Sequence, residues 1–375
     1  MKKILCILLC LLVLVPAGCK KTGENTVLTP GVEGGGADVP YKIAVVTGDT
    51  VYSEAIFEAR RQAANNPCII TRTFPDDMSA ENTISICTEL AADPLVKSIV
   101  FVRAVAGIDE AVKKVKAARP DILFIAGADT EDAGFVAQTA DLVMTQDMYN
   151  MGTEVINEAY RMGAKTFIHY TFARHLLSEP VLRRREAMVK RCEELGITFI
   201  DVTSPDPHTA EGGGGESRLF VEEDVSTQVG DYGANTAFFS TDCTIHTYLI
   251  KAVLENGAIY PQQCCPNPFH GYTAYFGIDS GEYNDPAGIL RETSRQIAAY
   301  GMTGRMATWP LSPDILMVKA GVTYALAYCN GEVGLELDRE KFDSIFDSIS
   351  DGRASVRSMG HAPNCLLFLC EYYML

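Results

Sequence analysis

Several polar side chains that could bind a ligand follow apolar runs of the sequence. Asp49 and Thr50 come soon after the run KIAVVT, and Arg103 follows the run VKSIVFV. Carboxylates and hydroxyls can hydrogen-bond hydroxyl or amide groups of a ligand, and a guanidinium can hold a carboxylate or phosphate through two parallel bonds. Each has a structural alternative, because Asp and Thr favour helix N-termini and Arg often forms surface ion pairs. The other candidates are Asp129, Asp147, Tyr170, Arg174, Asp242, Asp279 and Trp309.

Two aspartates and two aromatic residues in this set favour a small polar ligand. Asp242 and Asp279 could accept paired hydrogen bonds from neighbouring hydroxyls, as in a sugar or a nucleoside. Capping of a helix expected from residue 243 is the alternative for Asp242. The rings of Tyr170 and Trp309 could stack on a flat ligand, with hinge packing as the alternative for Trp309.

The sequence contains no motif that indicates catalysis or metal binding. It has no G-x-S-x-G elbow, no H-E-x-x-H and no G-x-x-x-x-G-K-[ST] motif, and its histidines are scattered. The vicinal pair Cys264–Cys265 has no C-x-x-C spacing and no regular His pattern nearby. We therefore expect a protein that is not an enzyme, with no catalytic residues, no metal and no cofactor.

The N-terminus predicts export and lipid anchoring. Two lysines precede an apolar run over 4–15, which is shorter than the roughly 20 residues of a membrane-spanning helix. Small residues then lead to Cys19, as in a lipoprotein signal, although Pro16 stands where an aliphatic residue is usual. We expect a signal peptide over 1–18, a lipid on Cys19, a flexible tether over 19–40 and an extracytoplasmic location at the membrane. Plain secretion and an uncleaved anchor are the alternatives.

Charge and cysteine content limit the partners of the remaining chain. The formal charge of −16 over 375 residues argues against nucleic acid, whose phosphates need a basic surface. Of the 12 cysteines, nine lie beyond Cys19, and most of these stand in apolar stretches typical of small core residues. An odd number leaves at least one free thiol if the others pair, and the sequence does not define the pairing.

The elements that must position these residues alternate along the chain from residue 41. Short apolar runs predict strands, and the amphipathic segments between them predict helices. The runs are continuous rather than alternating, which is typical of parallel strands covered on both faces. The predicted strands are 42–47, 68–73, 96–102, 122–126, 141–145, 166–170, 197–202, 237–240 and 272–278.

Two such series predict an α/β fold of two doubly wound, Rossmann-like lobes with a hinge. We expect the first lobe to contain 41–146 and 310–331, where Ser312, Pro313 and Asp314 are typical of a helix start. The second lobe would contain 147–309 and 332–375. An eight-stranded βα barrel is the alternative fold.

Four segments resemble the type I periplasmic binding proteins, in their order along the chain. Residues 150–164 and 183–201 are similar to the first two helices of that family's second lobe. Thr241 and Asp242 resemble its Asn-Asp pair, and 276–279 (FGID) its Gly-Phe-Asp strand end. The closest group is the DUF3798 lipoproteins, and the basic membrane protein branch, which binds nucleosides and riboflavin, is more distant. The chain departs from the sugar binders at Thr241, in a glycine-rich insertion and in its C-terminal tail.

This resemblance implies a lipid-anchored solute-binding protein that captures a small polar ligand between two lobes. Its partners would be a nucleoside, a sugar or a similar molecule, together with an ABC-type permease. A lipoprotein that passes a ligand signal to a membrane receptor is the first alternative, and an extracytoplasmic enzyme is the second.

Overall fold

The computed structural model describes residues 39–48, 53–75, 79–128, 132–209, 213–265, 267–279 and 285–375. The predicted signal peptide, the lipidation site Cys19 and most of the predicted tether lie outside the described residues. So do three candidate ligand residues, Asp49, Thr50 and Asp129. None of the helices in the described part of the chain has both the length and the apolar character needed to cross a membrane.

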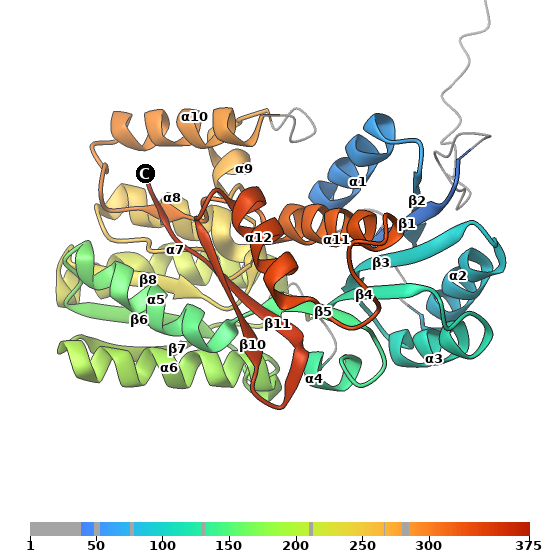
Figure 1. Cartoon of the computed structure of the whole chain (residues 1–375). Helices are drawn as coiled ribbons and strands as arrows, with labels where there is room; N and C mark the ends of the chain where they lie inside the picture. Colours follow the sequence, from blue (N-terminus) through green and yellow to red (C-terminus); the bar gives the residue numbers. More distant parts are fainter. Residues whose placement is uncertain are drawn as a thin grey trace, which may run out of the picture.

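Seven strands form the larger sheet of the described chain, in the order β10-β11-β5-β4-β3-β1-β2 (Figure 1). Its neighbouring strands run parallel, except for the antiparallel pair β10–β11. The bounds are β1 (Lys42–Gly48), β2 (Ile69–Phe74), β3 (Val96–Ala104), β4 (Leu123–Ala128), β5 (Leu142–Gln146), β10 (Ala354–Met359) and β11 (Ala362–Cys370).

Both faces of this sheet are covered, because its strands are apolar on both sides. In β1, Ile43 and Val45 belong to one core cluster, whereas Ala44 and Val46 belong to another. The first cluster includes residues of α1 (Ser53–Asn65), α11 (Pro313–Cys329) and α12 (Arg339–Ser350). The second includes residues of α2 (Ala80–Ala92), α3 (Ile108–Ala118) and α4 (Ala133–Val136).

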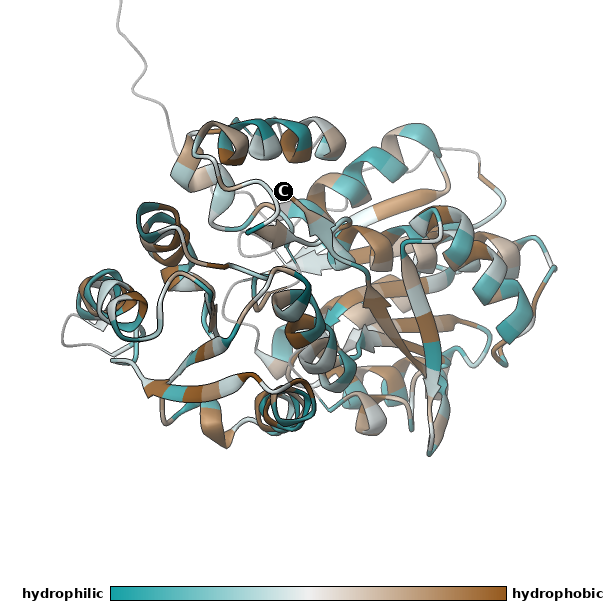
Figure 2. Cartoon of the chain, turned by 90° about the vertical axis from the view of Figure 1, so that its left-hand side faces the viewer, coloured by the Kyte–Doolittle hydropathy of each residue, from teal (hydrophilic) through white to brown (hydrophobic). Residues whose placement is uncertain are grey.

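A second sheet of three parallel strands in the described chain has the order β7-β6-β8. Its core clusters are shared with two pairs of helices, α5 with α6 and α7 with α8. Figure 2 shows apolar strands inside and helices of mixed hydropathy around them. The bounds are β6 (Thr166–Thr171), β7 (Thr198–Thr203), β8 (Thr236–Ser240), α5 (Met148–Arg161), α6 (Glu179–Leu195), α7 (Gly213–Tyr232) and α8 (His246–Asn256).

The fold is therefore α/β with two lobes, as predicted. Among the described residues, three connections join them: β5 to α5, β9 (Ala307–Thr308) to α11, and β11 to β12 (Tyr373–Met374). β9 and β12 pair with each other in an antiparallel ribbon beside the second lobe. Helix α11 packs on β1, β3 and β4 of the larger sheet.

The expectation that 332–375 belongs to the second lobe is wrong for most of this segment. Helix α12 packs on α11, and β11 pairs with β5, so both belong to the first lobe. β10 joins the same sheet through β11. Only the chain end returns to the second lobe, where Leu375 is buried in its core.

The second lobe also differs from the sequence predictions in local detail. The apolar run 272–278 is not a strand but the short helix α9 (Tyr272–Phe276), which ends at Gly277 in a left-handed conformation. The glycine-rich insertion contains the start of α7, at Gly213. Helix α10 (Pro286–Ala299) was not predicted, although Asp285 caps it through its bond from the Gly288 amide.

Candidate functional site

The carboxyl ends of the three strands of the second lobe bring polar side chains together. His175 follows β6, His208 follows β7, and Thr241 and Asp242 follow β8. Parallel strands place their carboxyl ends at one edge of a sheet, which explains how loops far apart in sequence meet here. We call His175, His208, Thr241 and Asp242 the second-lobe cluster.

Asp242 is the centre of the second-lobe cluster. One carboxylate oxygen, Oδ1, accepts the backbone N–H of Thr244 at 2.8 Å and so caps the helical turn that follows β8. The other, Oδ2, lies 2.9 Å from Nε2 of His208 and 3.8 Å from Nε2 of His175. Asp242 can therefore cap this turn through Oδ1 while Oδ2 faces the two histidines.

The electrostatics keep this carboxylate charged. Burial opposes ionisation of Asp242, but the hydrogen bonds from Thr244 and His208 outweigh it, so its pKa lies below the usual value. Burial lowers the pKa of His175, with the charge of Asp242 opposing the shift. The second-lobe cluster at neutral pH therefore combines a carboxylate acceptor with a neutral imidazole.

Hydroxyl groups extend the second-lobe cluster toward β6. Nδ1 of His175 lies 3.0 Å from Oγ1 of Thr241, and this hydroxyl also donates to Oγ1 of Thr171 over 3.4 Å. The bond to Nδ1 fixes which ring edge of His175 faces Asp242. Hydroxyl, imidazole and carboxylate groups in contact are suited to binding a ligand rich in hydroxyls.

An ion pair lies beside the second-lobe cluster. Arg174 donates from Nε and Nη2 to the two carboxylate oxygens of Asp206, over 3.1 and 3.2 Å. Its guanidinium also lies 5.1 Å from the ring centre of Phe172. About half of the Arg174 side chain is exposed, so the predicted ligand residue Arg174 is accessible next to Asp242.

The first lobe places a mostly buried charged group near the carboxyl end of β3. Nη2 of Arg103 lies 3.8 Å from Oδ1 of Asp314, which is near the start of α11. Glu54 in the first turn of α1 is also buried. Burial and the charge of Asp314 raise the pKa of Glu54 well above its usual value, and Arg103 opposes this shift. One guanidinium thus lies among two buried carboxyl groups.

The charged groups of the two lobes lie within electrostatic reach of each other. A hydrogen bond from Cys265 is the main cause that lowers the pKa of Cys243, and the charge of Arg103 acts in the same direction. Cys243 directly follows Asp242 after β8, whereas Arg103 lies near the end of β3. Arg103 of the first lobe thus acts electrostatically on a residue of the second lobe.

The other predicted ligand residues lie elsewhere. Tyr170 is fully buried and donates its hydroxyl to Asp224 at 2.8 Å, and Trp309 is 1% exposed in the core, so the candidate site excludes both. Asp147 is also buried, at the first connection between the lobes, where it caps α5. Asp279 is exposed just after α9 rather than at a strand end.

Sequence reasoning missed His175, His208, Asp206, Glu54 and Asp314 as members of this region. His208 and Asp206 lie in the loop after β7, so the rule that led to Asp242 could also have found them. Glu54 and Asp314 begin helices instead, and nothing in the local sequence distinguishes them from ordinary first-turn acids.

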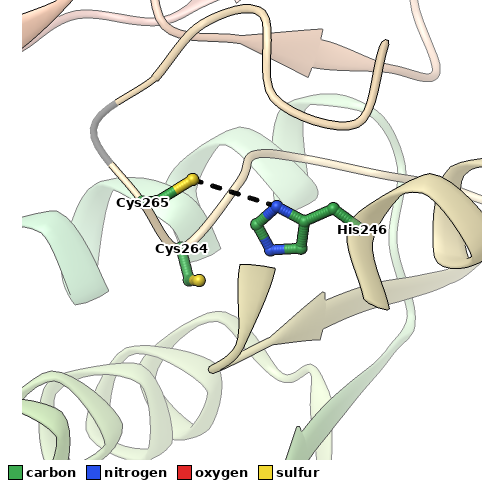
Figure 3. A group of neighbouring side chains, drawn as sticks. All are labelled: His246, Cys264 and Cys265. Atoms are coloured by element: carbon green, nitrogen blue, oxygen red, sulfur yellow. Dashed lines mark hydrogen bonds between the residues drawn. The ribbon is translucent and has the colours of Figure 1, made fainter. Parts of the chain in front are cut away.

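A group of thiols and imidazoles adjoins Asp242. One ligand atom from each of His246, Cys264 and Cys265 lies within 4.8 Å of the others (Figure 3). Cys243 contacts Cys265 through the hydrogen bond that lowers its pKa. Sulfur and imidazole nitrogen are the donors that zinc prefers, so these residues could hold a metal ion.

Solved structures with the same architecture define the class of this fold. A proposed transcriptional regulator from Clostridium difficile 630 is similar with a TM-score of 0.80 and 21% identity, over 89% of this chain and 99% of that one. A sugar ABC transport substrate-binding protein from Bordetella parapertussis 12822 is similar with a TM-score of 0.52 and 11% identity, over 90% and 89%. The fold is that of the two-lobed type I periplasmic binding proteins.

The family follows from the sequence itself. Residues 41–307 match the family described as a protein of unknown function (DUF3798), and the chain belongs to this family. An uncharacterized protein of Treponema pallidum (strain Nichols) is 32% identical over 218 residues, 58% of this chain and 98% of that protein. A second from the same organism is 31% identical over 201 residues, 51% and 88%.

Proposed function

We propose that this protein is an extracytoplasmic, lipid-anchored solute-binding protein that captures a small polar ligand between its lobes for an ABC-type importer. The proposal rests on one observation, the charged and hydroxyl-bearing side chains at the carboxyl ends of strands in both lobes. Ligands of open α/β sheets bind in this position, outside the carboxyl ends of the strands. Arg103 contributes from the first lobe and Asp242 from the second.

The chemistry of the second-lobe cluster favours a hydroxylated ligand such as a sugar or a nucleoside. Asp242 can accept hydrogen bonds from neighbouring hydroxyls through Oδ2, the oxygen not used for capping. Thr241 and His208 can each donate or accept. The accessible guanidinium of Arg174, which lies over the buried ring of Phe172, offers a flat surface beside them. Asp49, Thr50, Asp129 and Asp279 remain proposed ligand contacts.

The architecture supports closure of the lobes as the binding motion. The connections between the lobes are short segments, as expected for hinges between rigid bodies. A ligand held by Arg103 and Asp242 at once would favour the closed arrangement, because it would interact with both lobes only there. Closure would also remove water from the hydrogen bonds and present a joined surface to a permease.

The proposals of a transport partner and of a membrane anchor are supported by different observations. Solute-binding proteins for sugar ABC transporters share this fold, as in the Bordetella parapertussis structure, and the fold is the extent of that likeness. The anchor rests on the signal-like residues before Cys19. Labelling with a radioactive fatty acid, compared between the wild type and Cys19→Ala, tests the anchor independently of the ligand.

Native mass spectrometry of the protein purified from its own host is the first test of ligand binding. A retained mass, released on denaturation and identified by fragmentation, would name the ligand for calorimetric titration. We expect Asp242→Asn to weaken its binding about ten- to a hundredfold, as for loss of a hydrogen bond to a charged group. Asparagine keeps the cap to Thr244, so the fold should survive.

The control is Asp231→Asn, which removes an equal charge from an exposed residue at the C-terminal end of α7, before β8. Its affinity should equal that of the wild type. If Asp242→Asn binds the identified ligand as tightly as Asp231→Asn does, the second-lobe cluster is not the binding site. Crosslinking in cells then separates transport from sensing, because a permease or a membrane receptor would be captured at the closed face.

A further inference from the structure

Five donor side chains meet where β8 enters α8. They are Cys243, His246, Cys264, Cys265 and His270, from the turn after β8, the start of α8 and the segment that leads to α9. Sγ of Cys265 lies 3.0 Å from Nδ1 of His270 and 4.0 Å from Nδ1 of His246. Figure 3 shows the two neighbouring cysteines beside the ring of His246.

These separations are close to those of a tetrahedral zinc site. With Zn–S near 2.3 Å and Zn–N near 2.0 Å, neighbouring donors in a tetrahedron lie about 3.4 to 3.8 Å apart. One ligand atom each of His246, Cys264 and Cys265 already lies within 4.8 Å of the others. Small adjustments of these side chains would be needed to bring the donors to one ion.

One ring nitrogen of His246 lacks the partner that a buried polar atom usually has. Nε2 of His246 is buried and has no hydrogen-bond partner among the described residues, although buried ring nitrogens are normally satisfied.

A buried cation beside the cluster is a second, independent observation. Arg184 of α6 is 2% exposed, and Nη1 donates to the backbone oxygen of Cys264 at 3.3 Å. A buried guanidinium is costly unless it is neutralised, and negatively charged, metal-bound sulfurs would supply that neutralisation here.

We propose that Cys243, Cys264, Cys265 and His246 bind one Zn²⁺ ion in a closed, structural site. Three thiolates and one zinc ion carry a net charge of −1, which the guanidinium of Arg184 balances. His270 would hydrogen-bond the Cys265 sulfur and orient it as an outer partner. The spacing along the sequence gave no sign of this site, because its donors come from three separate segments.

The ion would fix the segment between α8 and α9 to the carboxyl end of β8. Cys243 directly follows Asp242, so the zinc site would also hold one wall of the proposed ligand site in place. Zinc binding and ligand binding can be tested separately, since the metal donors do not include the residues proposed to contact the ligand.

The test uses the mature chain, kept reduced, stripped with EDTA and titrated with ZnCl₂ against a chromophoric chelator. We expect one zinc ion per chain, and a melting temperature that falls on chelation and recovers on adding zinc. Cobalt substitution should show the thiolate-to-metal absorption of a site with several sulfurs. This spectrum needs no variant, so it tests the proposal even if substitutions impair folding.

Matched variants identify the donors. Cys265→Ser and His246→Gln should weaken zinc binding by about two orders of magnitude or more, and His270→Gln by about tenfold, as for an outer partner. Cys68→Ser, at a half-buried cysteine outside the cluster, should bind zinc like the wild type. The proposal is wrong if the reduced wild type binds no zinc, if Cys265→Ser retains it, or if native protein holds Cys243 and Cys265 in a disulfide.

Discussion

Nε of Arg357 in β10 donates to Oδ2 of Asp147 over 2.5 Å, which joins the first connection between the lobes to a strand formed 210 residues later. Asp147 is buried, and its carboxylate also accepts the backbone N–H of Asn150, at 3.1 Å, at the start of α5. The residue that the sequence suggested as a ligand contact at the hinge is thus a clamp that holds the hinge to the larger sheet.

This geometry predicts unequal costs for the two halves of the ion pair. Asp147→Ala removes a helix cap and the ion pair together, so we expect the free energy of unfolding to fall by about 2 kcal/mol. Arg357→Ala should cost about 1 kcal/mol or less, because that side chain is half-exposed and Asn150 still satisfies the carboxylate. Urea unfolding followed by circular dichroism measures both. Equal losses would show that Asp147 does not cap α5 in solution.

Helices α5 and α6 approach each other closely at Gly152, and this predicts the effect of adding a side chain there. A Cβ atom at this position would lie 2.4 Å from the backbone oxygen of Arg184 in α6. Gly152→Ala should therefore lower the free energy of unfolding by about 1 to 3 kcal/mol, because the two helices must separate. Gly230→Ala is the matched control in α7, where a Cβ would meet no atom within 4 Å. That change should raise stability by up to about 1 kcal/mol, the usual helix preference for alanine. Urea unfolding of both variants measures these changes. If both variants were more stable than the wild type, the close approach of α5 and α6 would be refuted.

The fold was largely predictable because the signals that build the parallel strands are local. The run KIAVVT is apolar on both sides, so it indicates a strand covered on two faces before any partner is known. β10 (ASVRSM) lacks such a run, and it exists because it pairs with β11. β11 lies beside β5 because the two strands pair, with Cys365 opposite Val143. No local sequence pattern encodes this pairing of distant segments.

The candidate site was predictable only in part. Strand ends can be located from sequence, and this led to Asp242 and Arg174, but side-chain direction depends on packing. Tyr170 lies on β6 with its ring turned into the core beneath α7, which alternation along a two-faced apolar strand cannot indicate. The cysteine and histidine donors lie in segments whose approach depends on the tertiary fold, so their spacing looks irregular.

Buried Glu158 predicts a dependence of stability on pH. Its Oε1 has no hydrogen-bond partner among the described residues, and burial raises its pKa well above the usual 4.5, with Arg161 opposing and Glu154 adding to the shift. Between pH 4.5 and the raised pKa the unfolded chain has released this proton and the folded chain has not. The free energy of unfolding must therefore fall as pH rises through this window, by up to about 1.4 kcal/mol per unit.

Glu158→Gln should remove that contribution. We expect the variant to gain stability relative to the wild type as pH rises above 4.5, with little difference at lower pH. Urea unfolding of both proteins from pH 4 to pH 8 gives the slope of the free energy of unfolding against pH. The two slopes should differ by the amount that roughly one linked proton produces. Glu154→Gln, at a half-buried residue one turn earlier in α5, removes an equal charge and should change the slope less. Parallel curves for Glu158→Gln and the wild type would contradict the raised pKa.

Tyr170 and Asp242 predict opposite effects on stability and ligand binding. Tyr170→Phe removes a buried hydroxyl that donates to Asp224 at 2.8 Å, so we expect a loss of about 1 kcal/mol in the free energy of unfolding. Because the ring lies in the core, the affinity for the ligand identified by mass spectrometry should not change. Asp242→Asn should do the reverse, since it keeps the cap while losing the charge that faces His208 and His175. Calorimetric titration and urea unfolding on the same samples separate the two effects. If Tyr170→Phe weakened ligand binding and left stability unchanged, Tyr170 would belong to the ligand site. Its side chain would then face the site in solution and not the core.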